Sequence, residues 1–96
     1  MATVVLGDFE WDSAKAQTNR RKHGVTFEEA MECFLDPHAI TAPDRLEPSR
    51  FVLIGMSQHS RLLFVVSVEA DENIRIISAR KASPQQRKVY ENGPKA

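Results

Sequence analysis

Residues 9–30 contain two helix starts and one helix stop, and these fix where the first helices of the fold lie. Asp12 is of a residue type that caps helices, because its carboxylate accepts hydrogen bonds from backbone N–H groups two or three residues later. Residues 13–22 lack Gly and Pro, and Gly24 stands where a left-handed residue ends a helix. Thr26, with a Glu three residues later, has the spacing of a capping box. The segment therefore predicts a helix over 13–22 and a second one directly after it.

The first of these helices has too few apolar residues to belong to a core. Lys15, Asn19, Lys22 and His23 fall on one stripe at helical spacing. A basic, hydrogen-bonding stripe indicates a surface for an anionic partner, but a hydrogen bond that ties the helix to a neighbouring loop explains Lys15 and Asn19 equally well. His23 likewise has two interpretations, an acid–base group or a residue that complements the helix C-terminus.

From residue 39 onward the apolar pattern is typical of strands. Strands are predicted over residues 50–55, 61–69 and 74–79, with short additions at 4–6 and 39–41. Ser83, Pro84 and Gln86 predict the start of a last helix, which Gly93 ends. We therefore expect an α+β fold of two N-terminal helices, a three- to four-stranded antiparallel meander and a C-terminal helix.

Composition limits the number of domains, the charge and the cellular location that we expect of the protein. Ninety-six residues predict one domain over 1–96, and the formal net charge of zero argues against a broadly basic nucleic-acid coat. Residues 51–96 nevertheless hold seven Lys or Arg against four Asp or Glu, so a local basic face is available. The lone Cys33 and the absence of a signal-peptide pattern favour a cytoplasmic location, and the apolar run 62–68 is too short to span a membrane.

The side chains that could carry chemistry are mainly cations. Cys33 stands alone and the three His residues are far apart, so we predict no metal site. The sequence contains no Gly-rich phosphate loop, so we predict no nucleotide cofactor either. Arginine binds phosphate well because its planar guanidinium donates to two oxygens at once. The candidates lie on the first helix or near strand ends: Lys22, His23, Arg50, Arg61, Arg75, Arg80 and Lys81.

Several blocks of the sequence together resemble one family. They are Phe9-Glu10-Trp11-Asp12, Lys22-His23-Gly24-Val25, Phe27-Glu28-Glu29-Ala30, Arg50-Phe51 and Ile74-Arg75-Ile76-Ile77-Ser78-Ala79-Arg80-Lys81-Ala82. In this order they look like the BrnT family, toxins of type II toxin–antitoxin systems. The resemblance implies a RelE-like fold and a ribonuclease that halts translation. It also implies a partner antitoxin, BrnA, whose ribbon-helix-helix part binds operator DNA for the complex, so that the toxin reaches DNA only through its antitoxin and contacts no membrane.

Cleavage of RNA without a metal ion requires a base for the 2′-hydroxyl, cations at the phosphate and an acid for the leaving oxygen. We predict catalytic roles for His23, Arg50 and Arg80, and RNA binding by Lys22, Arg61, Arg75 and Lys81. Structural alternatives remain open: a salt bridge from Arg80 to Glu28 or Glu29, a hairpin-flanking position for Arg61, and a solvent-facing strand position for Arg75.

The sequence departs from the family pattern at two acidic positions. Pro48 and Ser49 precede Arg50 where the family usually has Glu, and Gln86 also stands in place of a Glu. Loss of these carboxylates leaves a second hypothesis, a non-catalytic RNA-binding or corepressor module that acts with its antitoxin. A structural protein–protein adaptor is a third.

Overall fold

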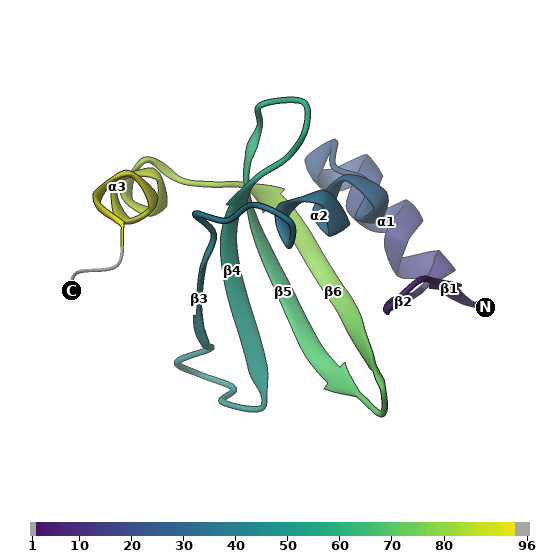
Figure 1. Ribbon diagram of the computed structural model, residues 1–96. Helices are drawn as coiled ribbons and strands as arrows, with labels where there is room; N and C mark the ends of the chain where they lie inside the picture. Colours follow the sequence, from purple (N-terminus) through teal and green to yellow (C-terminus); the bar gives the residue numbers. More distant parts are fainter. Residues whose placement is uncertain (1, 94–96) are drawn as a thin grey trace.

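The computed structural model describes residues 2–93, which form the helices and strands labelled in Figure 1. Two short strands come first, β1 (Thr3–Leu6) and β2 (Phe9–Asp12). The helices α1 (Ser13–His23) and α2 (Phe27–Cys33) follow them. The remaining elements are β3 (Ile40–Pro43), β4 (Arg50–Met56), β5 (Leu62–Ala70), β6 (Asn73–Lys81) and α3 (Pro84–Asn92).

The strands of residues 2–93 form one six-stranded sheet in the order β1-β2-β6-β5-β4-β3. Neighbouring strands are antiparallel except β2 and β6, which run parallel. The prediction that two helices begin the chain and that the sheet is a three- to four-stranded antiparallel meander is therefore wrong. The α+β class itself holds, because helices and strands are both present and mostly segregated along the chain.

The prediction failed at β2, and the reason is physical. The strand has four residues, and its last residue, Asp12, also caps α1 by accepting a hydrogen bond from the backbone of Lys15. Strand β2 forms a hairpin with β1, whose turn contains Gly7 with φ 61°. On its other side, β2 pairs in parallel with β6. Parallel pairing joins segments that are distant in the chain, so no local pattern could indicate it.

The predicted helix caps and the stop at Gly24 are confirmed, but the capping box predicted for Thr26 and Glu29 forms only in part, because the Glu29 carboxylate pairs with Arg61 instead. Gly24 ends α1 with φ 68°, and the Thr26 side chain caps α2 by accepting from the N–H of Glu29. Ser83 and Gln86 form a complete capping box at the start of α3. The three predicted central strands correspond to β4, β5 and β6.

The hydrophobic core lies between α2 and one face of the sheet. Phe27 of α2 and Leu63 and Val65 of β5 are fully buried, and Trp11 packs edge-on against Phe27 with 5.9 Å between ring centroids. Gly55 lets α2 come close, since a Cβ there would lie only 2.8 Å from the backbone oxygen of Cys33. The other face of β4–β6 is less covered: Val52, Phe64, Val66 and Val68 are half-buried there, whereas Ile54 and Leu62 are buried.

Helix α3 is held mainly by polar contacts. None of its residues is buried, and Figure 1 shows it to one side of the sheet, beyond β3. The Tyr90 hydroxyl donates to Asp36 Oδ2 at 2.6 Å, and the same oxygen accepts from the backbone N–H of Met56 at 2.8 Å. The hydrogen bond to Asp36 raises the pKa of Tyr90 to about 12, so this contact persists across the physiological pH range.

The side chain of Asn19 ties α1 to the sheet. Its Nδ2 donates to the backbone oxygens of Val25 at 3.0 Å and Ala79 at 2.8 Å, and its Oδ1 accepts from the N–H of Ala79 at 3.1 Å. The amide thus pairs with the outer edge of β6 as another strand would. Because Asn19 is the buried residue of α1, the structural interpretation of this residue is confirmed.

We expect Asn19→Ala to lower the free energy of unfolding by about 3 kcal/mol, because it leaves buried backbone groups of Val25 and Ala79 unpaired at about 1–3 kcal/mol each. Urea denaturation followed by circular dichroism measures this loss. Gln17→Ala, at an exposed position of the same helix, is the control and should change stability by about 0.5 kcal/mol or less. Equal stability of the two variants would contradict the assigned role of Asn19.

Candidate functional site

Three of the predicted cations lie on the face of β4, β5 and β6 that points away from α2, which we call the open face. Arg50 and Arg75 both pair with Val68, one from each side, and Arg80 pairs with Phe64. Val68 and Phe64 are four residues apart on β5, so their side chains share a face. The alternate residues of β5 are buried beneath α2. Register therefore gathers arginines from two strands on one surface.

A β-bulge in β6 places Arg75 and Arg80 on the same face. In a regular strand, residues five positions apart point to opposite faces. Here the pairing with β5 shifts register and skips Ile77, so the extra residue reverses the alternation between the two arginines. The sequence carries no signal for this bulge, and without it one of the arginines would point toward the core side.

Arg80 combines a cation with an aromatic surface. Its guanidinium lies 4.5 Å from the ring centroid of Phe64, and Nη1 donates to the backbone oxygen of Lys81 at 3.2 Å and to Gln86 Oε1 at 3.3 Å. The predicted alternative, a salt bridge to Glu28 or Glu29, does not form. Arg80 makes no ion pair within residues 2–93, so its positive charge is available to a ligand.

Arg50 and Arg75 differ in how their charge is balanced. Arg75 Nη1 donates to Glu10 Oε2 at 2.6 Å, and Asn73 donates to Oε1 of the same carboxylate at 3.1 Å. The hydrogen bonds from Asn73 and Arg75 lower the pKa of Glu10. Arg50 is exposed at the start of β4 and has no carboxylate partner in the described chain. Arg50 therefore offers a free cation, whereas Arg75 is largely neutralised.

The open face is extended, with free cations at both ends. Arg50 and Arg75 are two strand spacings apart, about 10 Å between Cα atoms. Arg80 lies four residues further along the sheet, roughly 13 Å. A linear polyanion that crosses the face diagonally would meet Arg50 near one end and Arg80 near the other.

Arg61 has a different environment from the other arginines. Its Nε donates to Glu29 Oε2 at 2.9 Å, its Nη2 bonds Glu29 Oε1, and Nη2 also donates to the backbone oxygen of Gly24 at 3.0 Å. Ser57 donates to the same carboxylate at 2.8 Å. The bond to Arg61 is the main cause of the lowered pKa of Glu29. Arg61 thus joins the start of β5 to α2 and to the end of α1, on the side away from the open face.

Lys22 and His23 border a second region, a hollow of about 460 Å³ between α1 and the bulged part of β6. Both side chains are exposed, and Lys15 of the same stripe is in the wall. The other wall includes Ser78, which pairs with β5 between the rows of Arg75 and Arg80. The hollow therefore adjoins the open face at the middle of β6.

Sequence reasoning missed two side chains of the open face, Arg45 and Phe64. With Val52 and Leu46 they line a hollow of about 560 Å³ beneath the β3–β4 loop. Phe64 looked like an ordinary strand residue, and only the register reveals that it supports Arg80. Lys81 pairs with Leu63, so its position alternates to the opposite side of the strand from Arg80.

Within residues 2–93 no group of three or more His, Cys, Asp or Glu side chains has the arrangement of a metal site. None of the helices α1–α3 is long and apolar enough to cross a membrane.

Comparisons with known proteins assign the chain to a family. The family described as ribonuclease toxin, BrnT, of type II toxin–antitoxin system matches residues 11–86. The crystal structure of the Brucella abortus ribonuclease toxin BrnT is similar with a TM-score of 0.65 and 32% identity, over 76% of this chain and 92% of that one. A search of curated proteins gave no match. The chain belongs to the BrnT family of ribonuclease toxins, and membership implies an antitoxin partner.

We expect Arg61→Met to reduce the free energy of unfolding by about 2 kcal/mol, because it leaves the nearly buried Glu29 carboxylate without its ion-pair partner. The pKa of Glu29 is lower in the folded protein than its ordinary value of 4.5, so its contribution is full above that pH and is lost as the pH falls below it. Denaturation at pH 7 and pH 3.5 should therefore show a smaller acid-induced loss in Arg61→Met than in the wild type. The same pH dependence in both proteins would contradict the ion-pair role.

Proposed function

We propose that this toxin cleaves RNA without a metal ion, by attack of a 2′-hydroxyl on the adjacent phosphate. A bond forms between the 2′-oxygen and phosphorus while the bond from phosphorus to the 5′-oxygen breaks. The 2′-hydroxyl loses its proton to a base, and the leaving 5′-oxygen gains one from an acid. The products are a 2′,3′-cyclic phosphate and a 5′-hydroxyl. This chemistry requires cations at the phosphate and a group that titrates near neutrality.

The observation that carries the proposal is the pair of unneutralised arginines on the open face. Within residues 2–93, Arg80 has no carboxylate partner and lies against Phe64, and the exposed Arg50 also has none. We assign the stabilisation of charge on the phosphorane to Arg80. Arg50 lies at the other end of the open face, so we assign it a neighbouring phosphate of the same RNA in place of the predicted catalytic role. An aromatic ring beside a cation also suits RNA, whose bases stack on aromatic and guanidinium surfaces.

His23 is the candidate for proton transfer. It lies in the wall of the hollow that adjoins β6, and histidine is the side chain whose ordinary pKa suits this task at neutral pH. Lys22 beside it adds positive charge along the path of the RNA. Lys81 points to the opposite side of the strand from Arg80, so it contributes only to the local field. Arg61 and Arg75 are engaged by Glu29 and Glu10, so they hold the scaffold and contribute mainly to the local field.

The partner in this proposal is a BrnA-like antitoxin with a ribbon-helix-helix part. That part binds operator DNA, so the toxin takes part in repression only through the antitoxin. Sequencing the reading frames next to the gene is the simplest check, because a short neighbour with a basic strand-helix-helix pattern is expected.

We expect Arg80→Ala to reduce the rate of RNA cleavage by about 10²–10³-fold, the usual effect of removing one donor that stabilises transition-state charge. Cleavage of a labelled RNA by purified protein under single-turnover conditions measures it. The matched control is Arg87→Ala, which removes the same charge from an exposed position of α3. Both variants should keep the wild-type melting temperature. Equal cleavage rates in the two variants would remove Arg80 from the mechanism.

The mechanism itself is tested with a modified substrate. A single 2′-deoxy nucleotide at the cleaved position should abolish cleavage there, EDTA should leave the rate unchanged, and the wild-type product should end in a cyclic phosphate. His23→Gln should lower the rate and remove one limb of its pH profile. Cleavage of the deoxy substrate would exclude 2′-hydroxyl attack, and RNA binding without any cleavage would support the non-catalytic alternative.

A further inference from the structure

A second surface lies on the core side of the sheet, where α2 ends too early to cover the strands. Helix α2 has seven residues, about 10 Å of length, whereas β5 has nine residues and spans roughly 30 Å. Figure 1 shows α2 lying near one end of β4, β5 and β6, with the other end of these strands extending past it. The uncovered end contains a hollow of about 340 Å³, close to the lower limit of ligand pockets, roughly 300 Å³.

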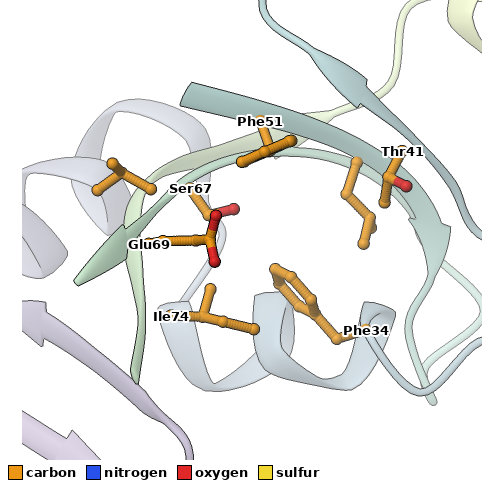
Figure 2. A pocket seen from close by; sticks show the side chains of 8 residues that line it. Phe34, Thr41, Phe51, Ser67, Glu69 and Ile74 are labelled. Carbon is orange, nitrogen blue, oxygen red and sulfur yellow. The ribbon is translucent and has the colours of Figure 1, made fainter. Parts of the chain in front are cut away.

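The hollow is apolar with one charged group. Most of its wall is formed by Phe34, Phe51, Leu53 and Ile74. Figure 2 shows Phe34 and Ile74 on one side and Phe51 on the other, with the carboxylate of Glu69 directed between them. Glu69 is exposed and forms no ion pair within residues 2–93, and no cation lines the hollow.

These properties decide the kind of partner. RNA is excluded, because a phosphate backbone would meet an apolar wall and an uncompensated carboxylate. An apolar side chain with a lysine or arginine next to it in sequence satisfies both features at once: the apolar group fills the hollow and the cation pairs with Glu69. The exposed acids Asp71 and Glu72 follow on the β5–β6 turn and extend the preference for a basic segment.

We infer that this hollow is the docking site for a basic, amphipathic segment of the antitoxin. The inference rests on the antitoxin partner proposed above, but not on the mechanism of RNA cleavage. It also explains how one partner could act on both faces. Phe51 follows Arg50 and Ile74 precedes Arg75 in the chain, so the hollow lies behind the end of the sheet that carries these arginines. An antitoxin anchored there has only to pass around the sheet end to reach Arg50.

Two variants test the docking site with the complete toxin and the antitoxin encoded by the adjoining reading frame. Glu69→Lys reverses the charge at the hollow, and Thr41→Trp fills it from an exposed position on β3. We expect each variant to raise the Kd for the antitoxin at least tenfold in calorimetry, since like charges placed face to face and a blocked pocket both oppose binding. Glu91→Lys makes the same charge change at an exposed position of α3 that does not line the hollow, and it should bind within twofold of wild type.

RNA cleavage by the free variants separates this inference from the proposed catalysis. Glu69→Lys and Thr41→Trp should cleave at the wild-type rate, because neither residue belongs to the open-face site. Wild-type affinity of both variants for the antitoxin would overturn the docking site, whatever the cleavage assays give. So would a toxin that dimerises without antitoxin and becomes monomeric with Thr41→Trp, since the hollow would then bind a second copy of the chain.

Discussion

The amide of Asn19 is the contact on which the arrangement of this toxin depends. Helix α1 buries almost no apolar surface, and the buried side chain that it contributes is polar. The amide completes the hydrogen bonding of the β6 edge at Ala79 and also holds the turn after α1 through Val25. A helix fixed in this way can keep its remaining surface polar. Lys22 and His23 thus lie beside β6 at little cost to folding.

The arginines fall into two groups according to whether a carboxylate neutralises them. Arg61 and Arg75 each lie within hydrogen-bond distance of a glutamate, whereas Arg50 and Arg80 have none in the described chain. Ion pairs of the first kind position secondary structure: Arg61 joins β5 to α2, and Arg75 joins β6 to β2. Cations of the second kind retain an unbalanced charge, which makes them the better candidates for contact with a polyanion.

The two faces of the sheet have opposite chemical character. The open face carries cations and the half-buried ring of Phe64, and the core side carries an apolar hollow with a carboxylate at its wall. This difference favours two separate partners, a nucleic acid on one face and a protein on the other. A toxin that must be both active and restrained benefits from the separation, because the partner that restrains it need not resemble RNA.

Gln86 illustrates how a departure from the family pattern has a local role. Its Oε1 accepts from the backbone N–H of Ser83 at 2.9 Å, within the capping box of α3, and from Arg80 at 3.3 Å. The neutral amide can orient the guanidinium without cancelling its charge. A glutamate at this position would place a carboxylate beside the same cation.

The sequence by itself determined where the helices begin, the three central strands and the family. Caps and stops such as Asp12, Gly24 and Ser83 act over three or four residues, so local chemistry is sufficient to define them. Tertiary structure alone decided the parallel pairing of β2 with β6 and the bulge at Ile77, because both depend on contacts between distant segments. It also decided which arginines are neutralised, since an ion pair forms through space and leaves no trace in the spacing of the chain.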